Sequence, residues 1–244
     1  MLKTTHVDAR LEGATPVSTT GRSVTGDLSA RAAGWGALTF AVTVIAQNLI
    51  RGATAPGNDA SPAEVLSHYS GHGAVSYVLA ATYVVSGIGM AVFLGGVTRP
   101  LLAGGRPGWA VTGVVGATCI MAVFALVVAA EQALTLAAHM DTPSIGAIQA
   151  LWALHNSIFT ILDLSIAVAL LGLSRATTAA GMTPKAFARL APIGAAMLLV
   201  GTIAGPAIAV GHAMALFAVT GVGFLIWLAF LIVTGIRLVR AEDV

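Results

Sequence analysis

Charged residues are scarce in this sequence. Asp, Glu, Lys and Arg together make up 9% of its 244 residues, against roughly 25% in an ordinary soluble domain. Hydrophobic residues reach 57%, and a fold surrounded by water could not cover that much apolar surface. The composition therefore excludes an ordinary water-soluble domain.

Cysteine is almost absent as well, since Cys119 is the only one. A single cysteine excludes an intrachain disulfide and any metal motif that needs several cysteines. Because Cys119 falls inside an apolar segment, we expect a small buried side chain there.

Dense basic clusters are also lacking. The formal net charge is +2, from 12 basic and 10 acidic residues, and the basic residues are scattered in short loops. A nucleic-acid interface needs a concentrated basic patch. We therefore expect no nucleic-acid partner and expect membrane lipids to surround the chain.

Long apolar segments are what the sequence does contain, and each is near the roughly 20 residues that a membrane-spanning helix needs. There are six of them: residues 32–50, 73–97, 109–138, 146–173, 188–210 and 213–236. The third and fourth exceed one bilayer thickness, so these helices should tilt or project. We predict an all-α, polytopic membrane helical bundle with six transmembrane helices.

The segments also define the domain organisation. Residues 1–31 are rich in Thr, Ser, Gly and Ala without an apolar run, which predicts a disordered cytoplasmic tail. They lack the apolar core and cleavage site of a signal peptide, so the first span should remain in the protein. Residues 32–236 form the predicted transmembrane domain, and residues 237–244 form a short cytoplasmic tail.

The distribution of basic residues predicts the orientation. Eleven of the twelve Lys and Arg residues fall in the N-terminal tail, the second and fourth loops and the C-terminus, whereas only Arg51 lies on the opposite side. Basic loops stay in the cytoplasm. We therefore expect a multi-pass protein of the cell membrane with both termini in the cytoplasm.

The first outer loop contains a helix signal. Ser61 and Glu64 have the spacing of a capping box, and Pro62 occupies the first helical position. We predict a short helix over residues 62–70 whose Val65 and Leu66 lie along the membrane interface. A lid over a binding site is the alternative.

Small residues and a proline predict packing and bending. Glycine or alanine at four-residue spacing lets helix backbones approach closely in lipid, here within one bundle. Pro206 leaves a carbonyl one turn earlier unpaired, so the fifth segment should kink near its outer end. The small residues are Gly87, Ala91 and Gly95 in the second segment and Gly201 and Gly205 in the fifth.

Polar residues recur within the fourth segment. Gln149, Asn156 and Asp163 are spaced by seven residues, which places them within about 20 degrees of one line on a helix. His155 lies one residue off this line. Such a stripe should face protein or a water-filled cavity, because lipid offers no hydrogen-bond partner.

The third segment supplies a counterpart for His155. With the turn centred on Pro143, Glu131 lies twelve residues before it and His155 twelve residues after it. At a rise of 1.5 Å per residue, both lie about 18 Å from the turn. We predict that this carboxylate and this imidazole meet, either as a structural pair or as a proton donor and acceptor.

These residues make up the candidate site in the outer half of the membrane. We assign Glu131, His155 and Asp163 as catalytic candidates, with Glu131 as the acid or base and His155 as its partner. Substrate-binding candidates are Gln149, Trp152 and Asn156. Asp163 could instead bond hydroxyl groups of a neighbouring helix.

Further titratable groups gather outside the predicted spans. Imidazoles and carboxylates suit zinc, and two histidines could ligate a haem, with His155 and His212 as the pair to consider. No spacing resembles a metal motif such as HExxH, so we predict neither a metal nor a cofactor. The outer groups are His68, His72, His139, Asp141 and His212.

The stretch APGNDASPAEVLSHYSGHG between the first two segments resembles the corresponding part of small, uncharacterised multi-span proteins of actinobacteria. Ten Arg against two Lys, with abundant Ala, Gly and Val, fits a GC-rich genome. The resemblance covers mainly residues 32–100. It implies a membrane bundle and no particular activity.

Three functions are compatible with these features. The first is an acid-base enzyme acting on a lipophilic substrate, an isoprenoid or another lipid, in an enclosed polar pocket. The second is a small transporter or proton-coupled permeation protein, for which the polar residues would have to continue across the bilayer. The third is a non-catalytic membrane subunit or sensor that uses the outer loop as a partner surface.

Overall fold

The computed structural model describes residues 28–209 and 211–241, and within them every regular element is a helix. The predicted tail over residues 1–31 lies outside this range except for its last four residues, of which Ala30 and Arg31 already belong to the first helix. The elements are α1 (Ala30–Thr54), α2 (Pro62–Gly71), α3 (Gly73–Ala103), α4 (Pro107–Ala138), α5 (Ile145–Ala179), α6 (Phe187–Ile203), α7 (Gly205–Ala209) and α8 (Met214–Arg240).

Five of the described helices, α1, α3, α4, α5 and α8, are long and apolar enough to cross a membrane. Helix α6 is apolar but has 17 residues. The fold is therefore a helical membrane bundle, as the composition predicted.

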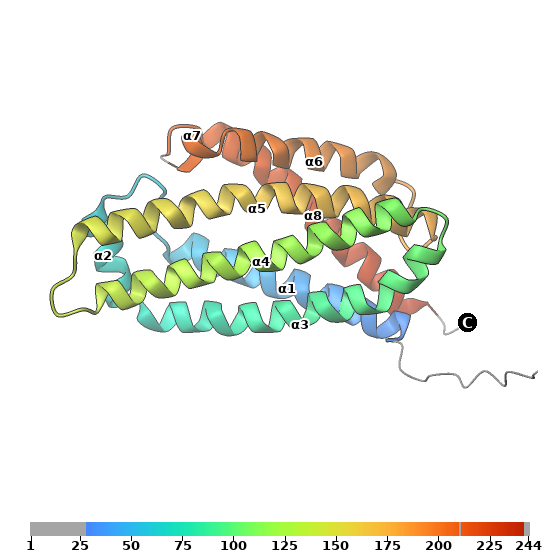
Figure 1. Cartoon of the computed structure of the whole chain (residues 1–244), viewed down its shortest axis with the longest axis horizontal. Helices are drawn as coiled ribbons and strands as arrows, with labels where there is room; N and C mark the ends of the chain where they lie inside the picture. Colours follow the sequence, from blue (N-terminus) through green and yellow to red (C-terminus); the bar gives the residue numbers. More distant parts are fainter. Residues whose placement is uncertain (1–27, 210, 242–244) are drawn as a thin grey trace, which may run out of the picture.

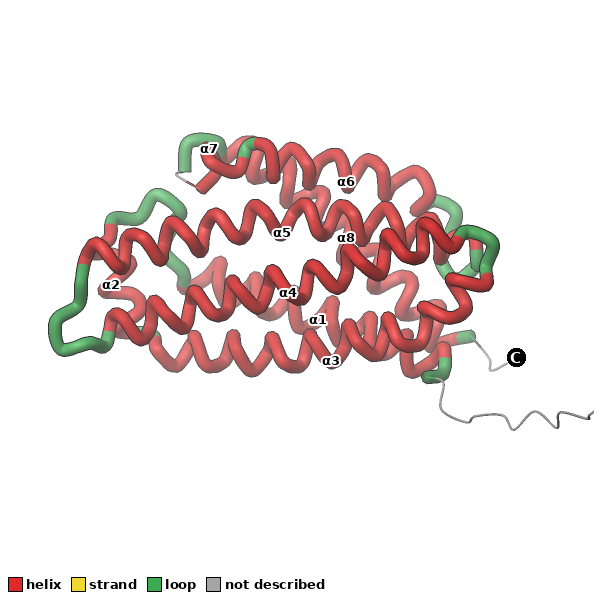
Figure 2. Tube along the Cα trace, viewed as in Figure 1, coloured by secondary structure: helices red, strands yellow, loops and turns green. Residues whose placement is uncertain are grey.

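The six long helices form a closed ring in the order α1, α3, α4, α5, α6 and α8, in which each packs against the next and α8 returns to α1. Figure 1 shows them lying side by side, with α2 and α7 together at one end of the bundle. The loops are confined to the two ends (Figure 2). The beginning of α1 and the end of α8 meet at the other end, where Gly34 packs against Gly235 and Val239.

Glycines allow the closest helix crossings. A β-carbon on Gly113 of α4 would overlap the backbone at Leu173 of α5, and one on Gly172 would overlap the backbone of Gly113. At the crossing of α1 and α3, a β-carbon on Gly36 would lie 2.6 Å from the carbonyl oxygen of Gly89. Small residues therefore hold this bundle together through backbone contact, as in other membrane proteins.

The predicted kink in the fifth segment is a complete break. Helix α6 ends at Ile203, and α7 begins at Gly205. The first α-helical hydrogen bond of α7 runs from the amide of Ile208 to the carbonyl of Ala204. Pro206 has no amide hydrogen to donate to the carbonyl four residues earlier. The break turns α7 across the end of the bundle.

Cys119 departs from its expected burial, because its side chain is exposed. The neighbouring Gly116 and Ile120 face the interior of the ring, and one residue corresponds to a rotation of about 100 degrees on a helix. Cys119 therefore lies on the outward face of α4.

Helix α2 forms where the capping box predicted it. The Ser61 hydroxyl accepts a hydrogen bond from the Glu64 amide, and the Glu64 carboxylate accepts one from the Ser61 amide at 2.7 Å. Val65 and Tyr69 of this helix are buried against the end of α4 and the beginning of α5. The helix therefore covers the bundle as a lid would.

This cap gives α2 a pH-dependent stability. Hydrogen bonds from the backbone and the hydroxyl of Ser61 lower the pKa of Glu64 from its ordinary value of 4.5. A lowered pKa in the folded state stabilises the helix above the unfolded pKa, and this stabilisation is lost as the pH falls through the folded pKa. We expect the hydrogen-exchange protection of the α2 amides to fall in that acidic range.

The Glu64→Gln variant should lack this pH dependence, because its side chain does not titrate. Ser61→Ala should instead lower α2 protection at every pH, since it removes the hydroxyl that accepts from the Glu64 amide. Equal pH profiles for wild type and Glu64→Gln would contradict the assignment.

Candidate functional site

A cavity of about 550 Å³ lies inside the helix ring, toward the end where α2 and α7 lie (Figure 1). Its lining comes mainly from α1, α5 and α8, with further residues from α4, α7 and the loop after α1. Some lining residues of α1 and α8 are also exposed, namely Asn48, Gly52 and Phe217. The opening therefore lies between the end of α1 and the beginning of α8.

A buried ion pair stands at the α4 side of this cavity. Nε of Arg51 donates to Oε1 of Glu131 at 2.7 Å, and Nη2 donates to Oε2 at 3.0 Å. The two side chains are 10% and 4% exposed. A two-point contact of this kind fixes the guanidinium and the carboxylate in one plane.

Aromatic rings complete the surroundings of the guanidinium. Its Cζ atom lies 5.5 Å from the ring centre of Phe124 and 5.6 Å from that of Phe159. The remaining nitrogen, Nη1 of Arg51, is buried without a hydrogen-bond partner in the described structure. Charge pairing and ring faces together compensate this cation in an apolar interior.

His155 joins the pair, as the sequence predicted from its register. Its Nε2 lies 3.4 Å from Oε1 of Glu131, and its Nδ1 lies 3.2 Å from Oδ1 of Asn156. The imidazole stacks on the indole of Trp152, with ring centres 4.9 Å apart and planes 11° apart. Both ring nitrogens are therefore engaged, and the ring orientation is fixed.

Asn156 connects this network to the loop after α1 and to α7. Its Nδ2 donates to the carbonyls of Asn58 and Ala209, at 3.4 and 3.3 Å. Asn58 in turn donates from its Nδ2 to the carbonyl of Ile208 at 3.1 Å. One side chain of α5 therefore ties the loop after α1 to α7 at the end of the cavity.

Helix α2 shields the polar network at one end of the bundle (Figure 1). Tyr69 packs edge-on against Trp152, with ring centres 6.4 Å apart. Burial, reinforced by the negative charge of Glu131, raises the pKa of Tyr69, so this hydroxyl stays neutral at physiological pH. Helix α2 therefore covers the polar network at this end of the bundle.

Asp163 lies deeper in the cavity, eight residues or about 12 Å along α5 from His155. Among the described residues, no hydrogen bond or ion pair holds its carboxylate. Gly201 of α6 makes room for it, since a β-carbon there would lie 2.6 Å from Oδ2 of Asp163. Thr220 of α8 closes the same corner, with its hydroxyl bonded to the carbonyl of Leu216 at 3.1 Å.

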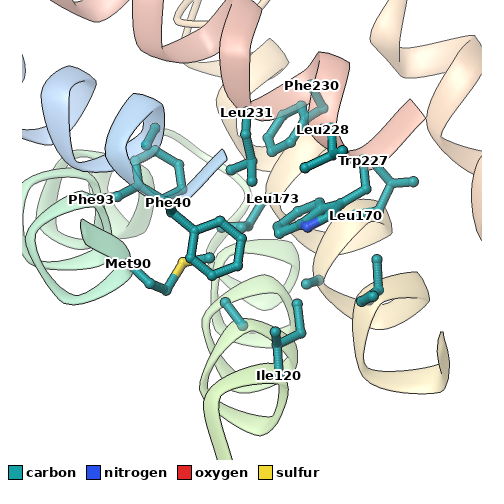
Figure 3. Packing of buried hydrophobic residues seen from close by; sticks show 14 of the residues in the cluster. Phe40, Met90, Phe93, Ile120, Leu170, Leu173, Trp227, Leu228, Phe230 and Leu231 are labelled. Carbon is teal, nitrogen blue, oxygen red and sulfur yellow. The ribbon is translucent and has the colours of Figure 1, made fainter. Parts of the chain in front are cut away.

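The cavity floor consists of tightly packed apolar side chains. Phe40 and Trp227 belong both to the lining and to the main core, and they are 2% and 1% exposed. Below them, Leu170 and Leu173 of α5 and Leu231 of α8 are fully buried. Figure 3 shows this packing layer between the helices. In this conformation it separates the cavity from the end of the bundle where α1 begins and α8 ends.

The predicted site residues separate into three groups. Trp152, His155, Asn156 and Asp163 line the cavity, whereas Glu131 contacts His155 from behind and is not part of the lining. Gln149 is exposed and away from the cavity. Of the polar stripe, only Asn156 and Asp163 therefore face the cavity. The beginning of α5, which carries Gln149, projects beyond the end of the ring.

Arg51 is the site residue that the sequence analysis missed, since it was counted as an outer loop charge. Helix α1 continues to Thr54, which places Arg51 inside the bundle. Gln47, one turn earlier, is also buried and donates to the Thr82 hydroxyl at 2.8 Å. Two polar residues four apart at the end of an apolar segment are the signal that could have identified this buried face.

The outer histidines have local partners instead of a shared ligand. His68 and His72 stack 4.8 Å apart, and Nδ1 of His139 lies 2.8 Å from the carbonyl of Thr135. Across the described residues, no group of three or more His, Cys, Asp or Glu side chains is placed to hold a metal. His212 is exposed and is not part of the cavity lining that includes His155, so the two do not form a haem pair.

No protein-family model, curated protein or solved structure matches this chain. The resemblance to actinobacterial multi-span proteins therefore adds no residue role. The functional argument depends on the geometry of the cavity.

Proposed function

We propose that this protein spans the cell membrane six times and acts as an acid-base enzyme on a lipophilic molecule, an isoprenoid or another lipid, bound in its cavity. The observation that carries the proposal is the unpartnered carboxylate of Asp163 in a mostly apolar chamber. Ligand sites are commonly apolar cavities with a few converging polar groups. An opening between α1 and α8 suits a ligand that arrives from the bilayer.

The sixth span in this proposal is α6 continued by α7. The 17 residues of α6 correspond to about 26 Å, close to the roughly 30 Å of a bilayer core. Pairing of Arg51 with Glu131 inside the bundle removes the one basic residue that opposed the orientation. The remaining basic residues support placing both termini in the cytoplasm.

The roles within the site follow from access to the cavity. Asp163 faces the ligand and is the proposed proton donor or acceptor. Glu131, locked between Arg51 and His155, acts as a positioning residue that keeps the imidazole in place. Trp152 and Asn156 form the wall at the outer end, where a polar group of the ligand would bind.

Transport is supported less well than catalysis. A permeation path would need polar groups to continue from Asp163 to the inner end of the bundle. The layer containing Leu170, Leu173 and Trp227 interrupts this route. A pocket closed at the floor suits a molecule that enters and leaves by the same opening.

Filling the cavity should displace the ligand. Gly221 lines the cavity, and a β-carbon there would meet nothing within 4 Å. We expect an apolar molecule to copurify with the wild type, and we expect Gly221→Phe to fold normally and to retain about tenfold less of it. Mass spectrometry of organic extracts from the purified proteins measures this difference.

Ala218→Phe is the matched control, because it adds the same ring to an exposed position of α8 outside the lining. Equal ligand content in both variants would refute the cavity as the binding site. The extracted molecule also tests catalysis, since proton transfer to its carbon atoms should introduce deuterium when wild type is incubated in D₂O. Absence of deuterium and of any other chemical change would leave a binding protein and not an enzyme.

A further inference from the structure

Aromatic side chains are concentrated around the cavity. Five of the eight Phe and two of the four Trp residues of the chain line it. The faces of aromatic rings attract cations, most strongly where water is excluded. The seven residues are Phe40, Phe124, Trp152, Phe159, Phe217, Phe224 and Trp227.

The charges of the lining residues leave one carboxylate without a counter-ion. Arg51, the only Lys or Arg of the lining, is engaged at two points by Glu131. His155 directs its two ring nitrogens to Glu131 and Asn156. The described residues therefore supply no cation to Asp163.

We infer that the ligand of this cavity is a lipophilic cation, meaning an ammonium or other onium group attached to an apolar body. Asp163 is half-buried in the cavity wall. A carboxylate without a partner in apolar surroundings is costly, and a bound onium group beside Asp163 would compensate it. The surrounding rings would stabilise the same positive charge. The inference deepens the proposed function, on which it rests, by naming the charge of the ligand.

Ligands of other charge fit the same surroundings less well. An anion would meet the carboxylate of Asp163 and would find Arg51 already neutralised by Glu131. A neutral lipid would leave the Asp163 carboxylate unpaired. An ammonium group held there would also bring an acidic proton to Asp163, which acid-base chemistry requires.

A pair of probes that differ mainly in the sign of their charge tests the inference. Tetraphenylphosphonium is a cation, and tetraphenylborate is an anion of nearly the same size and shape. Equilibrium binding to the full-length protein in phosphatidylcholine nanodiscs, after subtraction of binding to empty nanodiscs, gives each affinity. Comparing variants for one probe at a time removes the difference in membrane partitioning.

We expect Asp163→Asn to weaken tetraphenylphosphonium binding by at least about tenfold and to leave tetraphenylborate binding unchanged or stronger. Asp141→Asn, which removes an exposed carboxylate from the loop before α5, should change neither. Phe217→Leu keeps an apolar side chain at the exposed rim and should weaken cation binding about threefold. This variant provides the test if Asp163→Asn does not fold.

Unchanged tetraphenylphosphonium affinity in Asp163→Asn, or in Phe217→Leu where only that variant folds, would overturn the inference. If Asp163 acted as a neutral hydrogen-bond donor, asparagine would preserve binding in the same way. The wild type could fail to bind tetraphenylphosphonium while Gly221→Phe still loses the copurifying molecule. This result would refute the inferred positive charge of the ligand and would leave the proposed function standing. Equal cation binding by Gly221→Phe and wild type would refute both.

Discussion

Replacing Arg51 with methionine is expected to destabilise the protein by about 3 to 5 kcal/mol. The substitution keeps much of the side-chain volume but leaves the Glu131 carboxylate, 4% exposed, without its two-point partner. An uncompensated charge in an apolar interior costs more than the pair itself contributes. Reversible unfolding in mixed micelles, followed by circular dichroism, measures the loss.

The double variant Arg51→Met with Glu131→Gln should recover most of this stability, because it removes both charges together. Arg189→Met is the control for loss of a basic side chain, since Arg189 is exposed and should change stability by less than about 0.5 kcal/mol. A double-mutant cycle then isolates the coupling between the two residues. If Arg51→Met were as mild as Arg189→Met, the ion pair would have no structural role.

The contact between Glu131 and His155 could be predicted because it depends on counting alone. Two helices joined by a short turn run antiparallel, so residues equally distant from the turn share a level. Helix α4 ends at Ala138 and α5 begins at Ile145, which places the turn close to the expected centre at Pro143. The contact follows at 3.4 Å.

The partner of Glu131 could not be predicted by this counting. Arg51 and Glu131 are 80 residues apart, and their contact depends on how α1 and α4 each pack against α3, which lies between them in the ring. No short turn joins these two helices, so counting residues from a turn cannot show which of their residues lie at the same depth. The first apolar segment also ends at residue 50, whereas α1 continues for one more turn to Thr54.

Gln149 illustrates a second limit. Heptad spacing correctly placed it on the same face of α5 as Asn156 and Asp163. However, residues on one face of a helix of 35 residues can have different surroundings at different points along the helix. Near its beginning α5 has passed the end of the ring, so the same direction points to solvent and Gln149 is exposed.

The cavity itself arises from features that the sequence shows only separately. The helix break at Pro206 turns α7 across the bundle end, and the Asn58 and Asn156 side chains hold it there. Helix α2 covers the adjacent ends of α4 and α5. Together they roof a chamber whose side remains open between α1 and α8.

Alanine in place of Gly172 is expected to have the second large effect on stability. A β-carbon at this position would overlap the backbone of Gly113 and would lie 2.8 Å from the carbonyl oxygen of Trp109. Backbone atoms cannot rotate away as a side chain can, so α4 and α5 would have to separate along their crossing. We expect a loss of about 3 kcal/mol in micellar unfolding, at the upper end of the usual cost of overpacking.

The control is Gly108→Ala, near the beginning of α4, where a β-carbon would meet nothing within 4 Å. The same chemical change there should be neutral or slightly stabilising, because alanine favours the helix over glycine. The α4 and α5 crossing also sets the distance between Glu131 and His155, which lie farther along the same two helices. Gly172→Ala should therefore reduce retention of the copurifying molecule as well, and unchanged stability would show that the two backbones can separate without cost.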